Sequence, residues 1–343
     1  MTTSSSTHRL APQPPPGRPA ASARPERSAW RQRLSRWDTK ASPYAFVSPF
    51  LLLFLGFGIF PLVYTAYMSL YNYRLGGTKT WAGMGNFTWL LQDQFFWNAL
   101  KNTITLGIIS TVPQLLIALG LAHVLNYQLR ARNFYRVTML MPYATSVAAA
   151  TLVFSQLFGR DYGLINWMLG LVGVHHIDWQ NGSWSGQVAI ALIVTWRWTG
   201  YNALIYLAGM QSISQDLYEA AAIDGASRWR QFTNVTLPGL RPTILFTIVV
   251  STIGATQLFG EPYLFSGGGQ QAYNGGASHQ YQTLSLYMYQ QGWQYLQLGR
   301  AAAVAWATLL LVVVFVALNL TIARMRDRTP KIPATAAVEE VAR

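Results

Sequence analysis

The sequence predicts an all-α integral membrane protein with six transmembrane helices and a polar, helical loop between the fourth and fifth. Two observations carry this prediction. Of the 343 residues, 51% are hydrophobic and only 11% are charged, whereas soluble domains carry about 25% charged residues. Six apolar segments also reach the roughly 20 residues that a helix needs to cross a bilayer core of about 30 Å.

The six expected spans are joined by polar segments. In chain order they are Tyr44–Leu70, Ala99–Leu125, Val137–Phe158, Gln187–Met210, Thr243–Leu264 and Ala301–Ile322. Prolines lie inside or at the ends of the first three, which membrane helices tolerate because neighbouring helices and hydroxyl side chains satisfy the freed carbonyls. No internal repeat is visible, although many secondary transporters contain two related halves. A six-span chain without one is expected to supply half of a pathway.

Two polar tails flank the membrane domain, which is predicted at residues 43–323. Residues 1–42 are basic and proline-rich, without the apolar core of a signal peptide, and are expected to be a disordered cytoplasmic tail. Residues 324–343 are expected to form a second one. With the N-terminus cytoplasmic, 19 Lys and Arg residues fall in inner segments and five in outer ones. This bias places both termini and the loop at residues 211–242 on the cytoplasmic side of the cell membrane.

Several other functions are disfavoured by the residues present. The net charge is +13, but the basic residues lie in tails and short loops beside apolar runs, so no nucleic-acid partner is expected. The chain has no cysteine and five histidines without ligand-like spacing, so neither a thiol nucleophile nor a metal site is expected. No lysine follows a glycine as in a P-loop, so no ATP hydrolysis by this chain is expected. An enzyme with catalytic residues is therefore disfavoured.

The polar loop at residues 211–242 is predicted to form two short helices on the membrane surface. Ser214 is expected to cap the first helix, and Gly225 to end it in a left-handed conformation. Ser227 is expected to cap the second. Three residues recur on one face of that second helix: Trp229, Phe232 and Thr236. By spacing alone this is an amphipathic surface segment.

The same loop contains a longer motif. The motif begins with Glu-Ala-Ala, and three residues separate these from a glycine. Nine further residues separate the glycine from an apolar residue. One more residue then precedes a closing Leu-Pro pair. The positions are Glu219, Ala220, Ala221, Gly225, Val235, Leu237 and Pro238. This segment resembles the loop by which permease subunits of bacterial ABC importers grip their ATPases. It departs from that family's pattern only at Val235, where the family has Ile, and it retains an apolar β-branched side chain there.

The resemblance extends over residues 42–322. Four further segments are similar to carbohydrate-uptake permeases of the maltose-permease kind: Met141-Pro142, Asp161–Asn166, Leu207–Ile213 and Tyr263–Gly269. In detail the chain is similar to actinobacterial permeases for cellobiose and other β-glucosides. This resemblance implies a cytoplasmic coupling-helix loop in which Glu219 pairs with a basic group of an ATPase. There Gly225 provides a bend, and the alanines allow close approach.

The resemblance also implies partners and a mechanism. The expected assembly contains a second permease subunit, two ABC ATPase subunits that use ATP and Mg²⁺, and an extracellular sugar-binding lipoprotein. This chain would bind no cofactor itself. Closure of the ATPases would rock the two permeases between inward- and outward-facing states, so that sugar crosses by alternating access.

Candidate pathway residues lie in the fourth and fifth spans: Arg197, Trp198, Tyr201, Asn202, Gln257 and Glu261. An ionisable residue inside a span is costly and faces a cavity or a partner. Arg197 is therefore either a donor to sugar hydroxyls or one half of a structural pair with Glu261 or a backbone carbonyl. Tyr201 and Asn202 match the region that lines the pathway in the family it resembles. Gln257 and Glu261 are expected one turn apart on one helix face, lining that cavity or bonding between helices.

Two other functions remain open. A self-sufficient secondary transporter or channel would need coupling carboxylates within the spans, and Glu261 is the one candidate. An ABC permease for another solute, such as glycerol phosphate or an amino acid, would keep the assembly and change the cargo.

Overall fold

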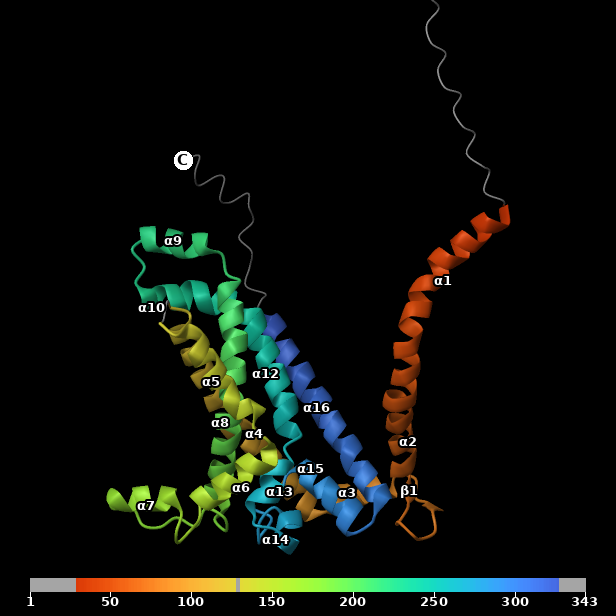
Figure 1. The fold of residues 1–343 in the computed structure, drawn as a ribbon. Coiled ribbons are helices and arrows are strands. Elements are labelled where there is room, and N and C mark those ends of the chain that lie inside the picture. The colour runs from red at the N-terminus through yellow and green to blue at the C-terminus, as the bar shows by residue number, and fades with distance from the viewer. Residues whose placement is uncertain (1–28, 128–129, 327–343) are drawn as a thin grey trace, which may run out of the picture. The chain divides into compact units, whose positions relative to one another are not determined.

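The computed structural model describes residues 29–127 and 130–326, and almost all of their regular structure is helical. The chain divides into two compact units, Met1–Pro61 and Leu62–Arg343. In the first unit, α1 (Ala29–Phe54) continues through the π-helical turn η1 (Leu55–Ile59) into the first residues of α2 (Phe60–Ser69) (Figure 1).

The helix α1 begins earlier than the sequence analysis expected. Residues 1–28, like residues 327–343, lie outside the described part. Residues 29–41 were assigned to the disordered tail, but they form the start of α1. This stretch contains neither glycine nor proline, so the backbone meets no helix breaker until Pro43. From Ser42 to Ser69 the chain is long and apolar enough to cross a membrane.

The second unit contains the remaining elements, and most of them are helices. They are β1 (Tyr71–Asn72), β2 (Thr80–Trp81), α3 (Gly85–Gln92), α4 (Gln94–Leu125), α5 (Arg132–Ala144), α6 (Val147–Leu157), α7 (Leu164–Leu171), α8 (Ser183–Gln211), α9 (Gln215–Ile223), α10 (Arg228–Gln231), η2 (Phe232–Thr236), α11 (Leu237–Gly239), α12 (Arg241–Thr256), α13 (Gly260–Phe265), α14 (Gly269–Asn274), α15 (Leu284–Tyr289), η3 (Gln290–Gln294) and α16 (Leu298–Arg326). The two strands pair antiparallel, with Tyr71 opposite Trp81.

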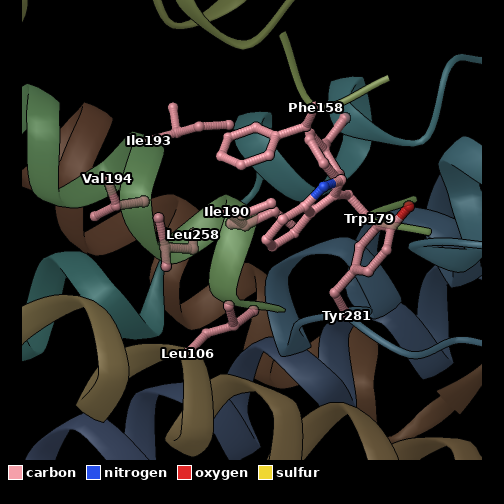
Figure 2. Packing of buried hydrophobic residues seen from close by; sticks show 10 residues of the cluster. Leu106, Phe158, Trp179, Ile190, Ile193, Val194, Leu258 and Tyr281 are labelled. Atoms are coloured by element: carbon pink, nitrogen blue, oxygen red, sulfur yellow. The ribbon is translucent and has the colours of Figure 1, made fainter. Parts of the chain in front are cut away.

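The core of this unit forms along α4 and α8, which run in the same direction. Near their N-terminal ends Leu106 of α4 packs with Ile190 and Ile193 of α8, as part of a larger apolar cluster (Figure 2). Near their C-terminal ends small residues of α4, including Ala118 and Ala122, belong to a second cluster with the C-terminal half of α8. Small side chains let helix backbones approach closely, which replaces the hydrophobic driving force that lipid does not supply.

Four helices are long and apolar enough to cross a membrane, and two bent helix pairs would raise the total to six in the described part of the chain. The third expected span is divided into α5 and α6, which meet at 89°. Thr145 lies between them with an extended backbone. Pro142 in the last turn of α5 removes a backbone donor, which weakens the helix just before this break.

The fifth expected span is shorter than predicted. The helix α12 ends at Thr256, and α13 begins only at Gly260. The carbonyl of Leu258, freed by this break, accepts a hydrogen bond from the hydroxyl of Thr283 at 2.5 Å. Because that partner lies 25 residues further along the chain, local sequence periodicity did not reveal the helix end.

Short elements gather at the two ends of α8 (Figure 1). The helices α9 and α10 lie beyond its C-terminal end, and α7, α13 and α14 lie near its N-terminal end. The short helix α7 lies in the loop before α8. The long segment before α16 is folded into α14, α15 and η3, and its Tyr281 and Gln282 are fully buried.

Candidate functional site

The α9 helix is bounded by the caps that the sequence predicts. The Ser214 hydroxyl accepts a hydrogen bond from the backbone N–H of Asp216 at 3.3 Å. At the other end Gly225 is left-handed, with a φ of 73°. The N–H groups of Gly225 and Ala226 donate to the carbonyls of Ala222 and Ala221. This Schellman arrangement satisfies the last carbonyls of the helix and needs a glycine at its left-handed position.

A second helical segment runs back beneath α9. Ser227 caps α10 by accepting from the N–H of Arg230, and the segment continues through η2 and α11. The hydroxyls of Tyr218 and Thr236 lie 2.9 Å apart and join α9 to η2. The expected apolar face is divided, because Thr236 and Phe232 are buried whereas Trp229 is 70% exposed and stacks on the Phe232 ring.

The residues of the Glu-Ala-Ala motif divide between surface and core. Glu219, Ala220, Gly225 and Pro238 are exposed, and Ala221 is half-buried. Leu237 instead packs against the apolar cluster of α4 and α8. Glu219 takes part in neither of the two ion pairs in the described residues. The motif thus combines an anchor into the helical body with an unpaired carboxylate on a projecting helix.

Two apolar side chains extend the exposed surface of α9. Ile223 is 87% exposed and Leu217 is 55% exposed. Exposed aliphatic side chains mark a contact surface where they gather into a patch. The sequence analysis did not single out either residue, although both lie within the predicted helix.

Arg197 in α8 and Glu261 in α13 form a buried ion pair. Their nearest side-chain atoms, Nη1 and Oε1, are 2.9 Å apart, and their side chains are 9% and 6% exposed. The other terminal nitrogen of Arg197 donates to the carbonyl of Thr145 at 3.4 Å. Arg197 therefore connects α8 to α13 and to the break between α5 and α6. Of the two interpretations of Arg197, this geometry matches the structural pair.

The neighbouring candidates differ in what they offer a ligand. The ring of Tyr201 stacks on Tyr143 at 4.7 Å, and Trp198 meets both rings edge-on. The side-chain amide of buried Asn202 donates to the carbonyl of Trp198 within its own helix. Tyr143 was missed by the sequence analysis, although it directly follows the Met141-Pro142 pair.

Gln257 does not share a helix face with Glu261, contrary to the sequence prediction. It terminates α12 with a non-helical backbone and is exposed, whereas Glu261 lies in α13 and is buried. The helix break after Thr256 separates the two side chains.

A small cavity lies beside Trp198, with a volume of about 30 Å³. Gln114 of α4 and Ser251 of α12 line it together with Trp198. It is large enough for a water molecule but not for a sugar. These two polar residues were not predicted as pathway residues.

Among the described residues, no three His, Cys, Asp or Glu side chains converge as they would around a metal ion. The folded features are instead those of a membrane transport component: long apolar helices, a buried ion pair and a projecting polar loop. Comparison with known proteins identifies the family of transport components to which the chain belongs. Residues 114–328 match the family described as the binding-protein-dependent transport system inner membrane component, and the chain belongs to this family of multi-pass membrane transport subunits, which are not enzymes.

Similar proteins include permease components of sugar transport systems. The lactose transport system permease protein of Rhizobium radiobacter is 36% identical over 82% of this chain and 94% of its own. The arabinooligosaccharides transport system permease protein of Bacillus subtilis (strain 168) is 34% identical over 84% of this chain and 90% of its own. Among solved structures, a chain of a bacterial ABC transporter for import of the polysaccharide alginate has a TM-score of 0.73. It covers 87% of this chain and 100% of its own at 24% identity, which indicates a shared fold.

Proposed function

We propose that this chain is a six-span permease subunit of an ATP-driven sugar importer and forms half of its translocation pathway. Both termini and the α9–α11 loop would lie in the cytoplasm, and a di- or oligosaccharide would cross by alternating access. The complete importer would contain a second permease subunit, two ATPase subunits and an extracellular sugar-binding lipoprotein. The bent pair α5–α6 would count as one span, and the fifth span would begin with α12, after the cytoplasmic loop.

The observation that carries this proposal is the exposed surface of α9. Its carboxylate at Glu219 has no ion-pair partner in the described residues, and Ile223, four residues further along the helix, presents apolar surface on the same side. A cleft on a partner ATPase with apolar walls and a basic side chain would complement both features. Because Leu237 anchors the same loop into the α4–α8 core, a displacement of α9 would be transmitted to the helices of the pathway.

A sugar is favoured over a phosphorylated cargo by the charges near the pathway candidates. Arg197 is neutralised by Glu261 at 2.9 Å, so it does not offer a free positive charge to a phosphate. The rings of Tyr143, Trp198 and Tyr201 offer amphipathic aromatic surface, which suits the faces of a sugar ring. The names of the relatives, which include lactose and arabinooligosaccharides, support the same class of cargo. Cellobiose or another β-glucoside remains a specific candidate within it.

Co-purification tests this function directly. The tagged chain is purified from its native host in mild detergent, and the associated proteins are identified by mass spectrometry. We expect a P-loop ATPase and a second permease with the wild type, and loss of the ATPase with Glu219→Arg. Asp161→Arg makes the same charge change at an exposed position outside the loop and should retain the ATPase. Recovery of the chain alone in a transport-competent form would contradict the proposal and favour a secondary transporter.

A further inference from the structure

A second, larger cavity lies far from the pathway candidates. Its walls come from α3, the start of α4, α15, η3 and the start of α16, at the end of the molecule opposite to α9 (Figure 1). It is open, with a volume of about 710 Å³. Small-molecule sites typically occupy roughly 300–1,000 Å³. In the proposed orientation this cavity opens at the outer surface of the membrane.

Aromatic rings form part of the cavity wall. Phe95 and Tyr295 are 39% and 42% exposed, so ring surface remains available to a ligand. Trp89 is covered on one face by the guanidinium of Arg300 at 4.1 Å. The side chain of Arg300 makes no hydrogen bond within the described part of the chain, so its N–H donors are also available. Exposed rings beside hydrogen-bond donors match a sugar, whose ring has apolar C–H faces and a rim of hydroxyls.

Five glutamine side chains line the cavity. Gln291 is only 4% exposed, yet its side chain makes no hydrogen bond within the described residues, although it lines the cavity. Its neighbour Gln290 is held in place by accepting from Gln282 at 2.8 Å and donating to Asn274 at 2.7 Å. An amide offers both a donor and an acceptor, as a sugar hydroxyl does. Gln291 is thus a buried amide at the cavity wall with unmet hydrogen-bonding capacity.

The charges in the cavity favour a neutral ligand. One oxygen of the Asp93 carboxylate accepts from the N–H of Phe95 at 2.9 Å, and the other accepts from the hydroxyl of Tyr287. Burial and the adjacent Asp93 raise the pKa of Tyr287, which keeps this hydroxyl protonated. Both oxygens of the Asp93 carboxylate are therefore already hydrogen-bonded within the protein. Besides Asp93, the ionisable lining side chains other than tyrosine are Arg300 and His279, too few cations for a nucleotide or polyphosphate.

We propose that this cavity is a saccharide-binding subsite, distinct from the pathway candidates, in which Gln291 and Arg300 bond to hydroxyls and Phe95 and Tyr295 contact the ring. The inference rests on the proposed sugar-import function and names a second place where that cargo is held. Such a site would retain a sugar at the outer mouth of the importer. A loop of another protein inserted into the cavity is the competing occupant.

A single reporter cysteine tests the subsite, because the natural chain has none. Gln92→Cys places a thiol at the cavity wall, and the importer is purified with its co-purifying membrane and ATPase subunits in lipid nanodiscs. Maleimide labelling is timed with cellobiose, lactose or maltose at tens of millimolar, and with betaine as the osmotic control. We expect at least one disaccharide to slow labelling severalfold. Gln291→Leu should abolish this protection, whereas the matched change Gln271→Leu, at an exposed residue outside the cavity, should leave it intact.

Three outcomes would overturn the subsite. These are no protection by any of the three sugars, equal protection by betaine, or protection that Gln291→Leu does not change. Protection by the extracellular binding protein alone would assign the cavity to protein docking and equally overturn it. Radiolabelled sugar uptake by the wild-type host is measured in parallel. Normal uptake with no cavity protection would reject the subsite and leave the import function standing, whereas absent uptake would reject the import function itself.

Discussion

The guanidinium of Arg197 lies 2.9 Å from the carboxylate of Glu261, and both side chains are almost fully buried. Because Arg197 also reaches the Thr145 carbonyl, this pair joins three separate helical segments at the break in the third expected span. Removing one partner would leave an uncompensated buried charge. Replacing both partners by apolar residues would not.

This difference predicts a non-additive double-mutant cycle. Arg197→Met and Glu261→Leu should each lower the free energy of unfolding by about 3–5 kcal/mol, whereas the double variant should recover most of that loss. Thermal unfolding of the purified protein in nanodiscs measures the effect. Losses in the double variant equal to the sum of the single losses would contradict a direct pairing. Sugar uptake by the double variant would then report whether the charges themselves are needed for transport.

The close approach of α5 to α8 predicts that Gly200 cannot be enlarged. A Cβ atom at Gly200 would lie 1.8 Å from the carbonyl oxygen of Met139, so the two helices would have to separate. Gly200→Ala should destabilise the protein by about 1–3 kcal/mol or more. Gly120→Ala is the control, because a Cβ atom at that position would have no neighbouring atom within 4 Å, and alanine favours a helix by up to about 1 kcal/mol. Equal melting temperatures for the two variants would argue against this packing.

The hydroxyl contact between Tyr218 and Thr236 predicts a weaker attachment of α9 when it is removed. Tyr218→Phe removes a hydrogen bond of about 0.5–1.5 kcal/mol and leaves the Thr236 hydroxyl, which is buried, without that partner. Hydrogen exchange should become severalfold faster in the amides of α9 and remain unchanged in α8. The control Tyr162→Phe, at a fully exposed tyrosine, should change the exchange rates of neither α9 nor α8. Unaltered exchange in α9 would mean that the turn residues alone hold the helix.

The proposed orientation predicts opposite labelling at the two ends of α8. In this cysteine-free chain, Ala222→Cys places a thiol on exposed α9 and Tyr162→Cys places one before α7. A membrane-impermeant maleimide should label Tyr162→Cys in intact spheroplasts, but Ala222→Cys only after the membrane is disrupted. The reverse pattern would invert the topology and exclude α9 as a cytoplasmic contact for an ATPase.

The helical elements of the loop and their ends were largely predictable from sequence, because their signals are local. Ser214, Ser227 and Gly225 cap or end helices as expected, since a side-chain oxygen or a left-handed glycine acts on backbone groups within a few residues. The apolar segments were equally visible, since crossing a bilayer demands a continuous apolar stretch. The role of Glu219 at an ATPase stays a prediction, as do the roles of the pathway candidates.

The sequence by itself determined the class of protein, the apolar segments that form the long helices and the bent helix pairs, and the residues that cap the helices of the polar loop. Only the tertiary structure decided that α12 ends at Thr256, that this break separates Gln257 from Glu261, and that Arg197 is paired. It also brought Phe95, Gln291 and Arg300 to one cavity. These features depend on contacts between residues distant in sequence, such as the bond from Thr283 to Leu258. Helical periodicity describes one helix at a time and does not indicate which other helix will pack against it.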